Sequence, residues 1–282
     1  MSDPESTPES AALDIADPPV DNNDVVKAGR QGDTHMGFAR SLATIIFIIA
    51  LPVAIVTTNV RLLMNAPLVY SYAFDRYNGE EATGLSRADL DSTGVALREY
   101  FNNDEPTFFH TVTANGLTTS VLNARETRHM EDVKQLITWV NQLQIASVMF
   151  CVAYGIIFFC WSREGNLREL AGQMLAGLLL GFVIVGAIGV AAIVAFDAAW
   201  EQFHVILFPS GFWLLNPRTD RLIQMFPEEF WRDATFMLGA LCLLEAALVA
   251  AIAGIYLLST KNERRHLAGS IAVGSASSSQ AA

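Results

Sequence analysis

The chain has 282 residues, of which 52% are hydrophobic and 17% charged, and its formal net charge is −11. Its apolar residues gather in long windows rather than at the short spacings of a globular core, which excludes an ordinary soluble fold. Nucleic acid is not an expected partner, because recognition of phosphates favours a basic surface. The composition therefore indicates a polytopic membrane protein.

The N-terminal segment, residues 1–40, is predicted to be a disordered acidic tail. Up to residue 33, acidic residues outnumber Lys27 and Arg30, and large apolar side chains are few. Such a segment cannot bury enough apolar surface to offset the entropy of ordering it. Residues 261–282 form a second predicted tail, whose end at 269–282 consists of small residues and is also expected to lack structure.

Four windows are long and apolar enough to cross a bilayer as helices, namely residues 41–60, 138–161, 170–198 and 234–259. Basic residues gather before the first window, between the second and third, and after the fourth, so both termini are predicted to be cytoplasmic. Residues 61–137 and 200–233 are then extracytoplasmic. The expected fold is an all-α bundle of four transmembrane helices, residues 41–260, with a small extracytoplasmic α+β cap.

The first extracytoplasmic segment supplies the cap. Ser86-Arg87-Ala88-Asp89 fits a capping box, which predicts a helix to about residue 102. The stretches 107–113 and 117–122 are rich in β-branched and aromatic residues and flank Ala114-Asn115-Gly116, a hairpin signal. His110 lies on this hairpin and is expected to be solvated.

The second extracytoplasmic segment is rich in aromatic residues, which suit a membrane interface. Asn216-Pro217 is predicted to open a short helix through about Met225, because proline is favoured at the first helical position. Pro227 with Glu228 and Glu229 is predicted to open the fourth span.

Small residues and one acid mark the packing of the spans. Gly177 and Gly181 form a GxxxG pair that lets another helix approach closely, and Ala246, Ala250 and Gly254 have similar spacing. Pro52 predicts a kink in the first span. Glu245 lies deep in the fourth span, where an ionisable residue tends to face the bundle interior. The sequence does not identify its partner.

The second span belongs to a longer helix that leaves the membrane. Neither proline nor glycine occurs between Asn123 and Tyr154, and Asn123 with Glu126 fits a capping box. Arg125, His129 and Asp132 then share one helix face. Asp132 can pair with Lys134 or Arg128, and the role of Glu126 can be limited to capping.

Two histidines are predicted to meet at the outer interface. His129 lies about 36 residues before the turn near residue 164 and His204 about 39 after it, so continuous antiparallel helices bring them within roughly 5 Å in height. The alternative is that both are structural interface residues. Asp197 is either structural or orients His204.

The same residues resemble a known family, the lipoprotein intramolecular transacylase (Lit-type) membrane proteins. The resemblance covers about residues 41–259 and implies a four-helix membrane protein with two essential histidines, which fall on His129 and His204. It rests on the pattern Arg125-Glu126-x-x-His129-Met130-x-Asp132 and on Phe203-His204, Phe208, Trp213-Leu214-Leu215-Asn216-Pro217, Asp220 and Phe226-Pro227-Glu228.

The resemblance implies acyl transfer within a bacterial lipoprotein. The partners would be diacylglyceryl-modified lipoproteins and membrane lipid, and one ester-linked acyl chain would move to the amine of the N-terminal cysteine, leaving a lyso-form. Neither a cofactor nor a metal is expected. The expected site has His129 and His204 as catalytic residues; Arg125, Glu126, Asp132 and Asp197 as supporting residues; and Phe203, Phe208, Trp213 and Asp220 as substrate- or lipid-binding residues.

The proposed chemistry is compatible with the residues. An α-amine has a reference pKa near 7.7–8.0 and needs a base to become nucleophilic. One histidine, assigned as His204, can serve as that base, while His129 stabilises the oxyanion, or the two roles are reversed.

Two other functions remain open on the sequence. One is a membrane metallohydrolase, although the chain has no HExxH motif. The other is a non-enzymatic scaffold or sensor. The three cysteines, Cys151, Cys160 and Cys242, give neither a disulfide framework nor a CxxC metal spacing.

Overall fold

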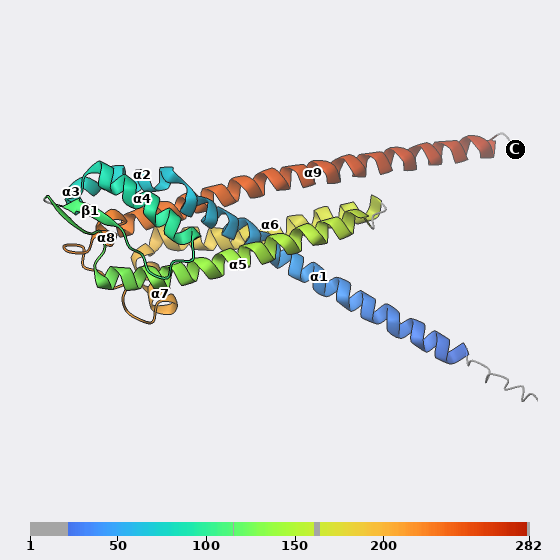
Figure 1. Ribbon diagram of the computed structural model, residues 1–282. Coiled ribbons are helices and arrows are strands. Elements are labelled where there is room, and N and C mark those ends of the chain that lie inside the picture. Colours follow the sequence, from blue (N-terminus) through green and yellow to red (C-terminus); the bar gives the residue numbers. More distant parts are fainter. Residues whose placement is uncertain (1–21, 115, 161–163, 281–282) are drawn as a thin grey trace, which may run out of the picture. The chain divides into compact units, whose positions relative to one another are not determined.

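The computed structural model describes residues 22–114, 116–160 and 164–280. The chain divides into two compact units, Met1–Thr44 and Ile45–Ala282. In the first, the described part is the beginning of α1 (Asn22–Asn65). The second holds the rest of α1 and the later elements, including the long helices α5 (Ala124–Cys160), α6 (Glu164–Val194) and α9 (Glu228–Gln280) (Figure 1).

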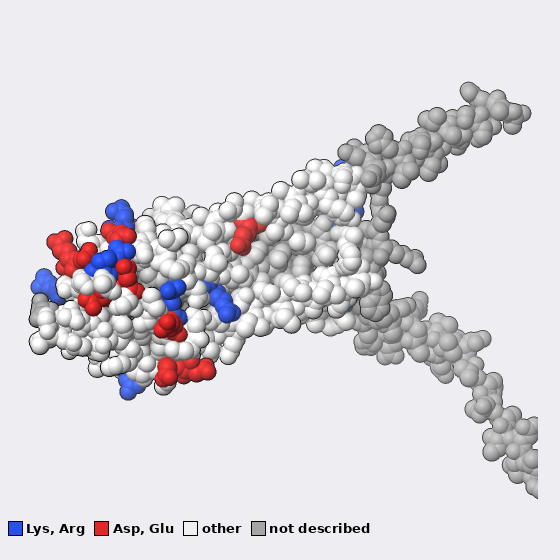
Figure 2. Space-filling model, turned by 45° about the horizontal axis from the view of Figure 1, so that its top comes forward, with Lys and Arg blue, Asp and Glu red and all other residues white. Residues whose placement is uncertain are grey.

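The mostly helical prediction with four spans is confirmed. Four helical stretches are long and apolar enough to cross a membrane, namely Gly37–Asn65, Ala124–Cys160, Leu167–Val194 and Glu228–Lys261. Large apolar side chains stay exposed along them, which is costly in water and favourable in lipid. On the face drawn in Figure 2, charged side chains gather at one end, over the short elements, and are scarce along the long helices.

The helices extend further than the predicted spans. α1 begins at Asn22 and α9 continues to Gln280, so residues 22–40 and 269–280 are helical where unstructured segments were expected. No proline occurs between Pro19 and Pro52 or after Pro227, so proline interrupts neither extension. Residues 1–21 and 281–282 of the predicted tails lie outside the described residues.

The third predicted span is not one continuous helix. α6 ends at Val194, Ala195 leaves helical geometry with φ −151°, and α7 (Phe196–Leu207) follows. Neither proline nor glycine marks this position, so the break has no signal in the sequence. After it, the ring of Phe196 is buried and stacks on Trp200, with 5.8 Å between ring centroids.

The cap contains the predicted hairpin and more helix than expected. β1 (Thr111–Ala114) pairs antiparallel with β2 (Leu117–Ser120), and Gly116 between them has φ +75°. The helices of the first segment are α2 (Pro67–Arg76), α3 (Gly79–Thr83) and α4 (Arg87–Asn102). The predicted cap of α4 is present, because Ser86 Oγ accepts a hydrogen bond from Asp89 N.

The short helix of the second extracytoplasmic segment begins later than predicted. It is α8 (Arg221–Met225), four residues beyond Pro217. Asn216 starts a turn instead, because its Oδ1 accepts from Arg218 N while its own N–H donates to Asp220 Oδ2. Pro227 does open α9, as predicted, and its carbonyl accepts from Phe230 N.

One carboxylate ties the cap to the long helix α5. Glu126 is only 1% exposed, and its Oε2 accepts from Asn123 N at 2.7 Å, as the capping box predicts. Its Oε1 accepts from Leu222 N of α8 at 2.6 Å. Glu126 thus does more than cap its own helix. Around it lies an apolar core drawn from the short elements and the helix ends, including Leu90, Leu97, Val121 and Met225.

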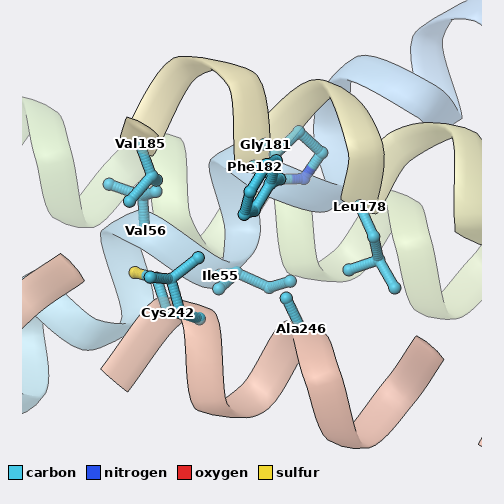
Figure 3. A pocket seen from close by; sticks show the side chains of 10 residues that line it. Ile55, Val56, Leu178, Gly181, Phe182, Val185, Cys242 and Ala246 are labelled. Atoms are coloured by element: carbon cyan, nitrogen blue, oxygen red, sulfur yellow. The ribbon is translucent and has the colours of Figure 1, made fainter. Parts of the chain in front are cut away.

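The GxxxG pair packs α6 against α1, as predicted. A Cβ placed on Gly177 would lie 3.0 Å from the carbonyl oxygen of Ile48, and one on Gly181 would lie 2.9 Å from Cβ of Pro52. A small apolar pocket lies beside this contact, with Ile55 of α1, Gly181 of α6 and Ala246 of α9 among its lining residues (Figure 3).

Glu245 has a partner in α1. Asn59 Nδ2 donates to Glu245 Oε2 at 2.8 Å and to the carbonyl oxygen of Ile55 at 3.0 Å. The Asn59 side chain is 1% exposed. A polar bond therefore joins the first span to the last, although Glu245 itself is exposed.

The helix contact at Gly181 gives a stability prediction. Gly181→Ala should lower the free energy of unfolding by about 1–3 kcal/mol, because the new methyl group meets the Pro52 ring and the helices must separate. Gly186→Ala is the matched control, since nothing lies within 4 Å of its Cβ position. Thermal unfolding in detergent measures both variants. Equal midpoints for the two would show that α1 and α6 are not closely packed at Gly181.

Candidate active site

His129 and His204 lie side by side, as their spacing along the chain predicts. Their ring centroids are 6.0 Å apart, with 38° between the ring planes. His129 lies in the second turn of α5 and His204 in the last turn of α7. Their exposed fractions are 8% and 7%. The break at Ala195 does not prevent the meeting, because α7 resumes at once after α6.

Aromatic rings enclose the two imidazoles. Phe208 lies against both, 5.1 Å from the His129 centroid and 5.5 Å from that of His204. Trp213 lies 5.0 Å and Phe203 5.3 Å from His204. The three predicted lipid-binding aromatics are therefore all at the histidine pair. They form an apolar wall against the two imidazoles that limits the access of water.

The proton on His204 is fixed by its own helix. His204 Nδ1 lies 2.8 Å from the carbonyl oxygen of Trp200. A carbonyl oxygen can only accept, so Nδ1 carries the hydrogen, and Nε2 of the neutral ring keeps its lone pair. His129 Nδ1 is buried and has no hydrogen-bond partner within the described ranges. The pair thus offers one defined basic nitrogen and one unused polar atom.

Burial keeps the pair uncharged. Desolvation lowers the pKa of His204 below its ordinary value, and the hydrogen bond to the Trp200 carbonyl opposes this only in part. A second imidazole 6.0 Å away further disfavours a positive charge on either ring. Two neutral imidazoles can act together as a base and a hydrogen-bond donor.

Two of the predicted supporting residues hold the loop between α7 and α8. Ser210 Oγ donates to Asp132 Oδ2 at 2.6 Å. The sequence had allowed Asp132 to pair with Lys134 or Arg128, and its partner is this serine instead. Arg125 Nη1 donates to the carbonyl oxygen of Leu214 at 2.8 Å. Both side chains therefore position the loop that carries Phe208 and Trp213.

Asp197 and Asp220, the remaining predicted acidic site residues, lie in structural contacts. Asp197 is exposed and lies near Glu228 at the start of α9. It does not orient His204, whose Nδ1 is taken by the Trp200 carbonyl. Asp220 is buried and does not face lipid, because its carboxylate accepts from Asn216 N and Asn123 Nδ2. The Asn216 N–H bond is the main cause of the lowered pKa of Asp220.

Trp200 and Ser210 are site residues that the sequence did not indicate. Trp200 precedes His204 by four residues, and its ring stacks on Trp231 of α9 with centroids 5.3 Å apart. The signal in the sequence for Trp200 is its i, i+4 spacing from His204 on α7, which places both on one helix face. His110 is not part of the site; its Nε2 lies 3.1 Å from Ser92 Oγ in the cap.

Within residues 22–114, 116–160 and 164–280, no three His, Cys, Asp or Glu side chains are placed to hold a metal ion together. The polar groups around the two imidazoles are instead engaged with backbone and hydroxyl partners, as described above.

Comparison with known proteins assigns the region that contains both histidines. A family model described as "Lipoprotein intramolecular transacylase Lit" matches residues 45–231. An uncharacterized protein of Aquifex aeolicus (strain VF5) is 28% identical over 132 residues, 44% of this chain and 53% of that protein. The chain thus aligns with about half the length of that relative.

Solved structures share the fold. The membrane integral lipoprotein intramolecular transacylase Lit from Bacillus cereus matches with a TM-score of 0.66 and 20% identity, over 80% of this chain and 99% of that one. A variant of the same protein with a histidine replaced by arginine matches with a TM-score of 0.64, 20% identity and 84% of this chain, again over 99% of the other. These likenesses establish a similar arrangement of helices and hairpin.

The lowered pKa of His204 predicts the pH dependence of stability. An unfolded histidine titrates near pH 6.5, whereas the folded protein holds this ring neutral to lower pH. The unfolded state therefore binds more protons as the pH falls, so stability is full above about pH 6.5 and decreases towards the folded pKa. The midpoint temperature of thermal unfolding in detergent should decrease as the pH is lowered from about 7 to about 5.

The matched variant is His204→Asn, whose side-chain amide can still donate to the Trp200 carbonyl. Its midpoint should depend less on pH than that of the unmodified protein. An unchanged pH profile in this variant would mean that His204 does not contribute to the acid sensitivity.

Proposed function

Because this chain belongs to the lipoprotein intramolecular transacylase Lit family, we propose that it moves an acyl chain within a diacylglyceryl-modified bacterial lipoprotein. The acyl chain leaves an ester of the glyceryl group and is attached to the amine of the N-terminal cysteine, giving the lyso-form. The observation that carries the proposal is the buried pair His129 and His204, 6.0 Å apart, within the region matched by the family.

The first step requires a base. The cysteine amine has a reference pKa near 7.7–8.0, so much of it is protonated at neutral pH and cannot attack an ester. Nε2 of His204 is the suitable acceptor, because Nδ1 is held in its protonated form by the Trp200 carbonyl. The amine nitrogen then forms a bond to the ester carbonyl carbon, and His204 takes its proton.

The second step requires a donor. The attack places a negative charge on the former carbonyl oxygen, and the N–H of neutral His129 can stabilise it inside an apolar wall, where hydrogen bonds are strong. The C–O bond to glycerol then breaks, and the proton on His204 passes to the departing glycerol oxygen. No water is consumed, and both histidines return to their starting state.

The arrangement favours transfer within one molecule. Amine and ester belong to the same substrate, so holding them together replaces a second binding event, and no acyl-enzyme is needed. The aromatic wall of Phe203, Phe208 and Trp213 against the histidine pair is the proposed contact surface for the acyl chains. Its apolar surface also keeps water from hydrolysing the ester.

The protein is assigned to the membrane with both termini cytoplasmic and the histidine pair at the extracytoplasmic face. Support comes from the basic residues that follow the spans, such as Arg168 and Lys261, since such residues favour the cytoplasmic side. Diacylglyceryl-modified lipoproteins and membrane lipid are the proposed partners.

The assignment of sides can be tested by thiol labelling in cells. Thr118→Cys on β2 and Lys261→Cys at the end of the fourth span are both exposed positions. A membrane-impermeant thiol reagent should label position 118 in intact cells and position 261 only after lysis. Labelling of position 261 in intact cells would reverse the orientation and remove the extracytoplasmic site.

The histidine pair can be tested by substitution. His129→Ala and His204→Ala should each reduce lyso-lipoprotein formation below about 1% of wild type, because base and oxyanion stabilisation each contribute about 10²-fold or more. The double variant should be no worse than either single one, since residues acting as a unit are non-additive. His110→Ala is the control and should remain active, because its partner is Ser92 in the cap.

The readout must distinguish isomers, because the acyl chain moves within one molecule and the mass does not change. Expression in a host that makes diacyl lipoproteins, followed by tandem mass spectrometry of the N-terminal peptide, shows whether the acyl chain is on nitrogen or oxygen. Membrane levels of each variant are measured in parallel. Full activity of either single variant at normal membrane level would return both histidines to a structural role.

A further inference from the structure

The loop between α7 and α8 closes over the histidine pair. Residues 208–215 leave α7 at Phe208, turn at Gly211 with φ +72° and carry Trp213 to within 5.0 Å of the His204 ring. Both imidazoles are less than 10% exposed beneath these rings. A diacylglyceryl group with its two acyl chains cannot reach an imidazole nitrogen in this arrangement unless some of the covering rings move.

The two ends of this loop region are held differently. Beyond residue 215 the contacts are buried or partly buried: Glu126 accepts from Leu222 N, and Asp220 accepts from Asn123 Nδ2. These bonds belong to the core that joins α8 to the start of α5. That part of the chain is therefore anchored to the core.

Residues 208–215 have few polar anchors, although Phe208 is buried against both imidazoles and Leu215 packs on the apolar core. Hydrogen bonds join this segment to side chains of α5: Ser210 Oγ donates to Asp132, and Arg125 donates to the Leu214 carbonyl. Both bonds are exposed. Water can replace either partner of such a bond, so its net contribution is small. The internal bonds of the segment are single turns, such as Gly211 N to the Phe208 carbonyl at 3.3 Å.

We propose that residues 208–215 form a lid over the histidine pair, with the Asp132–Ser210 hydrogen bond as its latch. Opening this bond lifts Phe208 and Trp213 away from the imidazoles, while the anchored segment at residues 216–222 stays in place. Asp132 lies on α5 less than one turn beyond His129, so the latch holds the lid at the reacting groups themselves. This inference rests on the proposed function, since it describes how that substrate reaches the site.

A reversible cross-link tests the lid. In a full-length chain whose three native cysteines are replaced by alanine, Asp132→Cys and Ser210→Cys are bridged by a short bis-methanethiosulfonate reagent in lipid nanodiscs. The bridged protein should lose transacylation, and dithiothreitol should restore the level of the unbridged double variant. A bridged protein as active as its reduced form would overturn the lid.

A matched bridge controls for cross-linking as such. Thr107 Oγ1 donates to Glu131 Oε1 at 2.7 Å, which is also an exposed bond between a loop and α5 but lies outside the lid. Thr107→Cys with Glu131→Cys, bridged in the same way, should keep its activity. Loss of activity in both bridged proteins would show that general rigidity, rather than the lid, is responsible.

A second readout does not depend on transacylation. Diethyl pyrocarbonate modifies neutral, accessible imidazoles, and peptide mass spectrometry reports the modification rates of His129 and His204. Bridging positions 132 and 210 should protect both rings, and reduction should restore their reactivity. If the reduced protein does not transacylate but bridging still protects both rings, the proposed function fails while the lid stands. Equal modification rates with and without the bridge would overturn the lid alone.

The latch itself is tested by one substitution. Ser210→Ala removes the hydrogen bond to Asp132 without adding bulk and should raise the modification rate of the two histidines about fivefold, the effect of losing one modest hydrogen bond. Ser92→Ala in the cap should leave the rate unchanged, because its hydroxyl bonds the Asp89 carbonyl and His110. An unchanged rate in Ser210→Ala would exclude this bond as the latch.

Discussion

The buried carboxylate of Glu126 is the contact on which the arrangement of the site depends. Its two oxygens accept one backbone N–H from the start of α5 and one from α8, segments nearly a hundred residues apart in sequence. An uncompensated charge at 1% exposure would be strongly unfavourable, so these bonds are obligatory once the core forms around it. His129 lies one turn further along α5, and its distance from α8 is set by the same contact.

The chemical character of the pair follows from what surrounds it. The Trp200 carbonyl decides which nitrogen of His204 is basic, and the rings of Phe208 and Trp213 keep both imidazoles dry and neutral. A soluble enzyme would need a deep cleft to create such a site. Here a helix end, a short loop and their aromatic rings are sufficient to bury the pair.

Much of this could be predicted from the sequence, since the signals were local or periodic. The four apolar windows, the caps at Ser86 and Asn123, the hairpin and the meeting of His129 with His204 all follow from spacing and helix rise. The break at Ala195 could not be predicted, because no residue there departs from helical preference. The contacts of Asp132 with a loop and of Asp197 with the start of α9 are tertiary, and no spacing rule describes them.

The hydrogen bond between Asn59 and Glu245 has a consequence for biogenesis. The two residues are 186 positions apart and lie on the first and last spans, so Asn59 enters the bilayer long before its partner has been synthesised. Until then, the side-chain amide of Asn59 can donate only to the Ile55 carbonyl of its own helix, the second of the two acceptors that it has in the folded protein. The first span must wait in the membrane with this polar group incompletely satisfied. Insertion of the fourth span therefore supplies the missing partner of the first and joins the two ends of the bundle.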